Sequence, residues 1–260
     1  MTKSKSDYSI QTVSNALRVL EVFSDEDEIG VSDLSRRLGL HKNNVFRLLA
    51  TLEENGYIEQ SAKSERYRLG TGCLELGRAY SRSNPLLRTA RPFLEALCEE
   101  LGETVHIGTL RGFEVIHLDS EQPEQLVMTS SRVGQRLPAH NTALGKVMLG
   151  ALDAAGRQQY VAEVLAASGA ERRTENSISD PHKFLEHVSH VALHGSAVDM
   201  EECEVGLRCV AAPVHDGNGR AIAALSVSAP SFRFDKDYML DTVEKAVVDA
   251  ANRLSHSLGQ

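Results

Sequence analysis

The chain has 260 residues and a formal net charge of -8, and 42% of its residues are hydrophobic and 25% charged. This composition is typical of a globular protein with room for two hydrophobic cores, which excludes a fibrous or disordered chain. We expect a cytoplasmic protein with no membrane partner, because no apolar run approaches the roughly 18 residues of a membrane helix and Met1–Ser9 is polar.

Three segments near the N-terminus have apolar residues at helical spacing. The first predicted helix covers Ser14–Phe23. The second covers Val31–Leu38, with Ser32 as its N-cap and Gly39 at its C-terminal end. The third covers Lys42–Asn55 and has one apolar stripe. Two short helices joined by a tight turn that contains glycine form the helix-turn-helix pattern.

The start of the third predicted helix carries polar, basic and aromatic side chains outside the apolar stripe. In helix-turn-helix proteins these positions contact base edges in the major groove. The candidate DNA contacts are Lys42, Asn43, Asn44, Phe46 and Arg47. A three-helix module that contacts protein has the same periodicity, so this alternative stays open.

Two short strand-like runs follow, Tyr57–Gln60 and Arg66–Leu69, and they predict a hairpin that forms a wing. Arg66 and Arg68 are its candidate contacts with DNA. Residues 31–70 contain seven Lys and Arg against five Asp and Glu, a local basic excess of two in an acidic chain. Since phosphate contacts need basic side chains, this region favours double-stranded operator DNA as a partner.

The remainder of the chain alternates between helical and strand-like patterns. A connecting helix over Gly70–Ser83 leads to Pro85, which begins another helix that ends at Leu101. Later helices are predicted to begin after His140 and to cover Asp153–Ala167, His182–Leu193 and Tyr238–Leu258. The predicted strands are Thr104–Leu110, Glu114–Asp119, Gln125–Thr129, Gly206–His215 and Ala221–Ala229, the last two joined by the hairpin signal Asp216–Gly219.

These elements predict an α+β protein with two domains and a connection between them. The winged helix-turn-helix covers residues 1–70 and the linker helix residues 71–84. A C-terminal domain with a mostly antiparallel sheet covers residues 85–260.

Motifs for catalysis or metal binding are weak. The short motifs of hydrolases, metalloproteases and phosphate loops are missing from the sequence, so we predict no enzyme activity and no cofactor. His187, His190 and His194 share helical spacing, but a solvated helix face explains them, and we predict no metal. The four cysteines form no CxxC pair and suit a reduced compartment. Cys203 and Cys209 leave open an enzyme or a direct redox sensor as the rival function.

Small polar residues interrupt the apolar strands near the C-terminus. Ser226 and Ser228 alternate by two and therefore project on one face of a strand. There they either line a cavity or meet solvent, and the pattern favours neither. The acidic segment Asp199–Glu204 has the pattern of a solvated loop.

Three blocks of the sequence resemble the IclR-type transcriptional regulators, and the resemblance runs from about Thr12 to Ser255. The first block joins Arg47–Leu52, Gly56–Ile58, Tyr67–Gly70 and Leu76–Gly77. The second block is Leu137–Lys146. The third joins Asp199–Glu202, Gly206–Val214 and Ala224–Pro230.

The resemblance implies a winged-helix domain, a linker helix that helps to dimerise it, and a GAF-like effector domain, with dimers that commonly pair into tetramers. It also implies a small organic acid, aromatic or sugar-acid effector that changes how two winged helices are spaced. The matching effector-binding positions are Thr142, Ala143, Leu144, Asp199, Leu207, Cys209, Ser226 and Ser228. Backbone N–H groups at a helix start suit a ligand carboxylate, and serine hydroxyls add hydrogen bonds to it.

The recognition helix departs from the family pattern. Asn43 and Asn44 stand where relatives often have Ser-Thr, and Phe46 replaces a more polar ring. Because Asn can pair bidentately with adenine, the operator sequence does not transfer from relatives. The family contains both repressors and activators, so the direction of the response stays open. A purely structural DNA binder, which would show no ligand-induced thermal shift, is the third function class.

Overall fold

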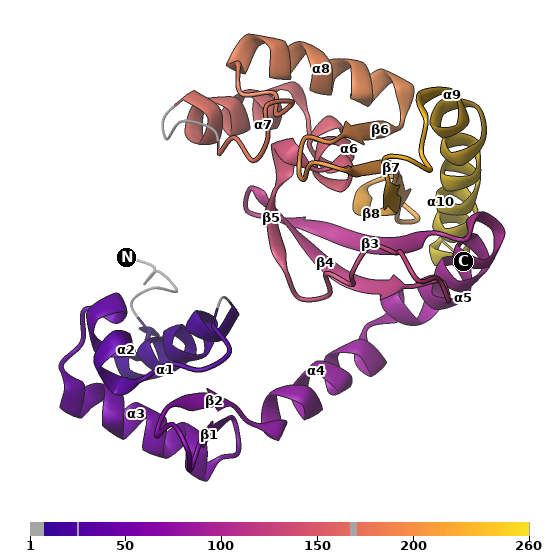
Figure 1. Cartoon of the computed structure of the whole chain (residues 1–260). Coiled ribbons are helices and arrows are strands. Elements are labelled where there is room, and N and C mark those ends of the chain that lie inside the picture. The colour runs from indigo at the N-terminus through magenta and orange to yellow at the C-terminus, as the bar shows by residue number, and fades with distance from the viewer. Residues whose placement is uncertain (1–7, 25, 167–170, 260) are drawn as a thin grey trace. The chain divides into compact units, whose positions relative to one another are not determined.

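The computed structural model describes residues 8–24, 26–166 and 171–259, and Figure 1 labels the helices and strands. Residues 1–7 of the polar N-terminus Met1–Ser9 and the predicted helix end at Ala167 lie outside this part. The chain forms two compact units that divide between Asn84 and Pro85. Within the described ranges, no helix is both long enough and apolar enough to cross a membrane.

The N-terminal unit combines a helical core with a two-stranded hairpin. Its elements are α1 (Gln11–Glu21), a 3-10 turn (Val22–Ser24), α2 (Val31–Leu38), α3 (Lys42–Glu54), β1 (Ile58–Gln60), β2 (Tyr67–Leu69) and α4 (Thr71–Ser83). The apolar stripe of α3 lies in the core, where Val45 and Leu49 are fully buried. The order of the elements confirms the predicted winged helix-turn-helix.

The ends of α2 illustrate what the sequence pattern reveals. Gly39 has a φ of 68° and ends the helix as predicted, in a left-handed conformation that favours glycine. The predicted N-cap at Ser32 is wrong, because Gly30 is the N-cap. The Gly30 carbonyl accepts hydrogen bonds from the N–H groups of Asp33 and Leu34, so Ser32 lies inside the first turn.

Glycines join the end of α3 to the start of α4. Gly56 follows α3 with a φ of 77°, and its carbonyl oxygen accepts a hydrogen bond from the N–H of Gly72 at 2.9 Å. A Cβ atom at Gly70 would lie 2.4 Å from that oxygen, and one at Gly72 would lie 2.9 Å from it. Both approaches are too close for a side chain, so this junction has room only for glycine.

The C-terminal unit is built, over its described residues, on an antiparallel six-stranded sheet with the order β5-β4-β3-β8-β7-β6. The strands are β3 (Thr104–Arg111), β4 (Glu114–Glu121), β5 (Arg136–Pro138), β6 (Ala197–Met200), β7 (Leu207–His215) and β8 (Ala221–Pro230). The helices are α5 (Pro85–Leu101), α6 (Ala143–Gly150), α7 (Ala154–Tyr160), α8 (Pro181–His194), α9 (Lys236–Tyr238) and α10 (Glu244–Leu258). A 3-10 turn (Ala139–Asn141) precedes α6, and π-helical turns follow α7 (Val161–Ala166) and α9 (Met239–Val243).

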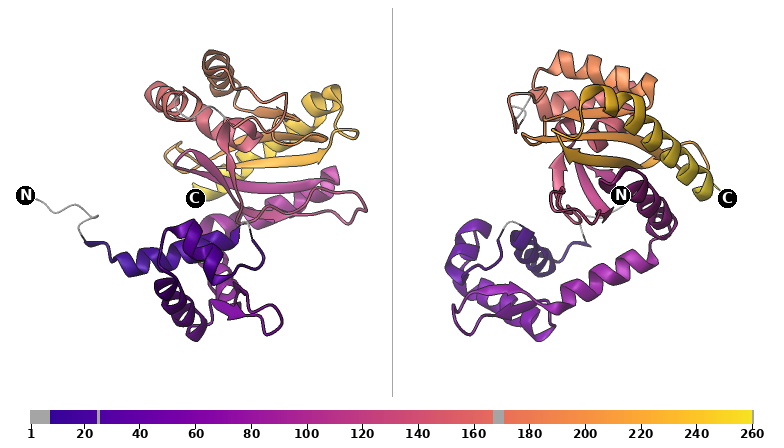
Figure 2. Two further views of the ribbon diagram at one scale, coloured as in Figure 1. Left: turned by 60° about the vertical axis from the view of Figure 1, so that its left-hand side comes forward. Right: turned by 45° about the vertical axis from the view of Figure 1, so that its right-hand side comes forward.

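The sheet separates two apolar cores, and Figures 1 and 2 show it between two helix layers. α5 and α10 pack on one face, over Leu225 and Val227 of β8. α6 packs on the other face, over Ala224, and α8 packs against α6. Because side chains alternate along a strand, Ser226 and Ser228 share the face of Ala224. The unit confirms the predicted α+β class and places both serines on the α6 side.

The predicted strand Gln125–Thr129 is wrong. Its backbone accepts hydrogen bonds from individual side chains and is not paired with a strand. The Thr104 hydroxyl donates to the Thr129 carbonyl at 3.0 Å, and the Arg233 guanidinium donates to the Val127 carbonyl at 2.9 Å. Val127 is 54% exposed, so its apolar character does not bury this segment against the sheet. β5, which follows the segment, pairs with β4 instead.

Candidate functional site

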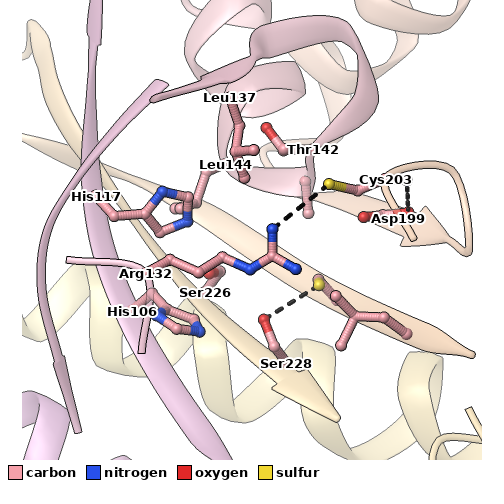
Figure 3. Close-up of a pocket in the computed structure, with 13 residues that line it drawn as sticks. His106, His117, Arg132, Leu137, Thr142, Leu144, Asp199, Cys203, Ser226 and Ser228 are labelled. Carbon is pink, nitrogen blue, oxygen red and sulfur yellow. Dashed lines mark hydrogen bonds between the residues drawn. The ribbon is translucent and has the colours of Figure 1, made fainter. Parts of the chain in front are cut away.

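A small cavity lies on the α6 face of the sheet, beside the start of α6 (Figure 3). Its volume is about 20 Å³, which is space for about one water molecule. The side chain of Arg132 reaches across it in Figure 3. The structure brings all eight predicted effector-binding positions to this cavity, whose lining is His106, His117, Arg132, Leu137, Thr142, Ala143, Leu144, Asp199, Cys203, Leu207, Cys209, Ser226 and Ser228.

The register of the strands sets which side chains meet in the cavity. Cys209 of β7 pairs with Asp199 of β6 and with Ser228 of β8, so these three residues form one row across the sheet. The Ser228 hydroxyl donates to Cys209 Sγ at 3.1 Å. Ser226 lies two residues back on the same face and pairs with His106 of β3. Four strands therefore bring polar side chains to one place within an otherwise apolar core.

The start of α6 presents backbone donors to this polar row. Thr142 is the N-cap, and its side chain accepts a hydrogen bond from the Gly145 N–H at 3.0 Å. The first N–H groups of a helix have no partner within the helix, and here they belong to Ala143 and Leu144, which line the cavity. A Cβ atom at Gly145 would lie 2.2 Å from the carbonyl oxygen of Ala139, so glycine allows the close packing that holds the helix start in place.

Asp199 is buried, although the sequence pattern predicts a solvated acidic loop over Asp199–Glu204. It is 1% exposed and lies in β6. Its Oδ1 accepts hydrogen bonds from the N–H groups of Glu202 at 2.7 Å and Cys203 at 3.3 Å. Its Oδ2 has no hydrogen-bond partner among the described residues. The prediction fails because the fold supplies a buried cation, Lys146, whose Nζ lies 2.5 Å from Glu202 Oε1.

The titration of Asp199 reflects this burial. Desolvation raises the pKa of its carboxyl from 3.8 to about 7, and outweighs the opposing charge of Lys146 and the two backbone hydrogen bonds. Between pH 3.8 and about 7, therefore, the Asp199 carboxyl is protonated in the folded protein and ionised in the unfolded chain. Since protons bind more strongly to the folded state, the free energy of unfolding decreases as pH rises through this window.

Asp199→Asn is expected to remove this pH dependence, because asparagine keeps the Oδ1 acceptor and does not ionise. Its free energy of unfolding, measured by urea titration, should rise relative to that of the natural chain as pH increases from about 4 to about 7. The difference should then stay constant at higher pH. Asp249→Asn, at a position whose side chain is 68% exposed, is the matched control. Parallel curves for the natural chain and Asp199→Asn would contradict the assignment.

Three polar residues of the cavity are not among the predicted effector-binding positions. His106 and His117 are 2% and 4% exposed, and burial is the main cause that lowers their pKa values to about 3 and about 4. Both histidines interrupt apolar strands, as the serines do, and this pattern could have predicted them. Arg132 lies in the irregular segment before β5, where no periodic pattern marks it.

The cysteines of the cavity do not have the environment of reactive thiols. Cys203 and Cys209 are 4% and 8% exposed. Burial raises the pKa of the Cys203 thiol and raises that of Cys209 well above 9.0. Since the thiolate is the reactive form, this environment disfavours the redox-sensor alternative.

The three histidines that share helical spacing, His187, His190 and His194, lie on α8. The rings of His190 and His194 stack with centroids 5.0 Å apart. Burial lowers the pKa of His187 to about 4. In the described ranges, no group of three or more His, Cys, Asp or Glu side chains is placed to hold a metal ion.

The start of α3 is an exposed surface. All five positions predicted to contact DNA in this helix are exposed: Lys42, Asn43, Asn44, Phe46 and Arg47. The alternating burial along α3 explains this, since Val45, Leu48 and Leu49 face the core. Phe46 is 57% exposed, an unusual position for a large aromatic side chain without a partner surface.

The arginines of the hairpin are exposed, and each already contacts another group of the chain. The Arg66 guanidinium donates to the backbone carbonyl of Glu28 at 2.9 Å. Arg68 pairs with Glu59 of the neighbouring strand at 3.2 Å. Arg66 therefore ties the wing to the loop before α2, and both remain predicted DNA contacts.

Two family models match the chain. Residues 12–62 match the IclR helix-turn-helix domain, and residues 78–256 match the bacterial transcriptional regulator IclR C-terminal domain. The HTH-type transcriptional regulator XynR of Escherichia coli (strain K12) is 34% identical to this chain over 251 residues, which cover 96% of this chain and 98% of the relative.

Solved structures are similar as well. An IclR transcriptional regulator from Alicyclobacillus acidocaldarius superposes with a TM-score of 0.85 and 26% identity, covering 96% of this chain and 99% of that chain. The inducer-binding domain of a double mutant of the transcription factor PobR from Acinetobacter, solved with 3-hydroxybenzoic acid, has a TM-score of 0.59 and 31% identity. That comparison covers 65% of this chain and 96% of the PobR domain.

Proposed function

Because the chain belongs to the IclR family of transcriptional regulators, it is a DNA-binding regulator, and we propose that a small organic acid in the α6 cavity changes its affinity for operator DNA. Residues 71–84 then act as a linker helix between a DNA-binding domain over residues 1–70 and an effector domain over residues 85–260. As a regulator, it is not an enzyme, in keeping with its named relatives.

One observation carries the effector proposal: the buried row of Asp199, Cys209 and Ser228 faces the N-terminus of α6. Backbone N–H groups at a helix start and serine hydroxyls are donors that suit a carboxylate. The PobR inducer-binding domain, solved with 3-hydroxybenzoic acid, supports an acid as the class of effector. The proposed contacts are Thr142, Ala143, Leu144, Asp199, Leu207, Cys209, Ser226 and Ser228.

The DNA contacts are proposed from the exposed start of α3 and from the wing. α3 enters the major groove, where Asn43 and Asn44 reach base edges and Lys42 and Arg47 reach phosphates. The chain binds as a dimer or tetramer, since one helix-turn-helix makes too few base contacts for specific binding.

Arg47→Ala is expected to weaken operator binding and to lower the slope of log affinity against log salt by about one, because one phosphate contact is lost. Lys42→Ala should act in the same way. Fluorescence anisotropy on a fragment selected by the natural chain from random DNA measures both effects, and sedimentation of the complex gives its stoichiometry.

Lys245→Ala, an exposed position on α10, is the control and should leave both affinity and slope unchanged. Unchanged operator binding in both the Lys42 and Arg47 variants would contradict the role of α3. A complex with one chain per operator would contradict the proposed oligomer.

A further inference from the structure

Phe46 is the single large apolar side chain on the exposed surface of α3, a helix whose residues are all described. It is 57% exposed. The other apolar side chains of α3 larger than alanine are buried or half-buried, and they are Val45, Leu48, Leu49 and Leu52. The hydrophobic stripe that holds α3 in its unit therefore does not use Phe46, and the ring is accessible to a partner.

The position of Phe46 along α3 directs it toward the bases. Side chains three and four residues apart share a helix face, so the ring lies on the face of Asn43 and Ala50, both of which are exposed. Helical side chains lean toward the N-terminus of their helix, so the ring also lies toward the start of α3. The N-terminal residues of a recognition helix are the ones that meet base edges. When α3 enters the major groove, Phe46 therefore enters with Asn43.

The ring of Phe46 has neither a hydrogen-bond donor nor an acceptor. Over a polar base edge it would displace water and leave a base donor or acceptor unpaired, which is unfavourable. The major-groove edges of guanine, cytosine and adenine present hydrogen-bonding groups, whereas thymine also presents its C5-methyl group. Thymine is therefore the base that this ring fits.

The polar surroundings of Phe46 favour DNA over a protein partner. Asn44 and Arg47 are exposed beside it, together with Asn43. The core of a protein interface is a contiguous apolar patch depleted in charged residues, which a single ring among amide and guanidinium groups does not provide. In the major groove the thymine methyl group is likewise a single apolar group among polar edges.

We propose that Phe46 packs against the C5-methyl group of a thymine in each half of the operator and so selects thymine at that position. Asn43 beside it reads a base through hydrogen bonds, whereas Phe46 reads one through apolar contact alone. This inference rests on the proposed function, because it assumes that α3 enters the major groove.

Deoxyuridine in place of thymine tests the contact, because it removes the C5-methyl group and keeps the base pair. Fluorescence anisotropy measures binding to the fragment that the natural chain selects from random DNA, with its thymines replaced one position at a time. We expect one such replacement in either half of the operator to lower the affinity of the natural chain about fourfold, the equivalent of about 0.8 kcal/mol for one buried carbon group. Replacement in both halves should lower the affinity roughly fifteenfold.

Variants of Phe46 link this preference to the ring. Phe46→Ala should bind operators with thymine and with deoxyuridine equally, whereas Phe46→Leu keeps an apolar side chain and should still favour thymine. Phe232→Ala, the control, removes a ring that is 74% exposed in the C-terminal unit, and it should keep the full preference. Since Phe46 lies outside the core, the melting temperatures of its variants should match that of the natural chain.

Different outcomes would overturn the methyl contact and the proposed function. If no deoxyuridine replacement weakens binding by the natural chain, or if the preference persists in Phe46→Ala, the methyl contact is wrong, while weaker binding by Lys42→Ala and Arg47→Ala still supports α3 in the groove. If the Phe46→Ala, Lys42→Ala and Arg47→Ala variants all bind the operator as the natural chain does, α3 does not meet the DNA and both proposals fail.

Discussion

Replacing Lys146 with methionine is expected to lower the free energy of unfolding by about 3 to 5 kcal/mol, the usual effect of removing one partner of a buried ion pair. Lys146 is fully buried in α6, and its Nζ lies 2.5 Å from Oε1 of Glu202, which is also buried. Methionine has a similar length and fills the space, but it leaves the carboxylate of Glu202 without its counter-charge. Urea unfolding followed by circular dichroism measures the change.

Two further variants make this result specific. Lys146→Met combined with Glu202→Gln removes both charges and should recover much of the lost stability. Arg253→Met breaks an ion pair with Asp249 whose side chains are 69% and 68% exposed, and it should cost less than about 1 kcal/mol. A cost in Lys146→Met no larger than that in Arg253→Met would show that the buried pair does not stabilise the fold.

The second large effect is expected on ligand affinity. Ser226→Ala combined with Ser228→Ala should reduce binding of the acid that the natural chain binds best. Each hydrogen bond lost to a charged ligand costs roughly 1.5 to 3 kcal/mol, about ten- to a hundredfold in affinity. Both side chains are buried on the cavity face, and among the described residues the Ser228 hydroxyl donates only to the weakly accepting Cys209 Sγ. Calorimetry measures the affinity.

Operator binding without ligand separates a binding role from a structural role. If the serines contact the ligand, the double variant should bind operator DNA as the natural chain does and should melt at a similar temperature. Ser257→Ala, at an exposed position of α10, is the control for both measurements. Natural ligand affinity in the double variant would show that the acid binds elsewhere.

Local patterns predicted α2 and α3 closely, because one buried face marks each of these two helices. α2 begins at Val31 and ends at Leu38, as its apolar spacing indicates. The strand predicted over Gln125–Thr129 does not form, because this apolar run with β-forming residues is not paired with a neighbouring strand. Strand pairing depends on distant residues, and the run itself carries no sign of it.

The predicted pocket positions came together because alternation and family motifs point to the same strand faces. Ser226 and Ser228 are an example, since their spacing of two residues places them on one face whatever the fold. The burial of Asp199 was not predictable in this way. It depends on Lys146, more than 50 positions away in the sequence, and on desolvation that only the packed structure creates. Arg132 enters the cavity from a segment without periodicity.

The glycine junction between α3 and α4 has a mechanical consequence. Since the Gly56 carbonyl contacts Gly70 and Gly72 with no space for a Cβ atom, the two helices have no soft joint at this point. A rotation of α4 is therefore transmitted to α3 with little bending between the two helices. Any signal that reaches α4 would then change the angle of α3, which carries the proposed base contacts Asn43 and Asn44.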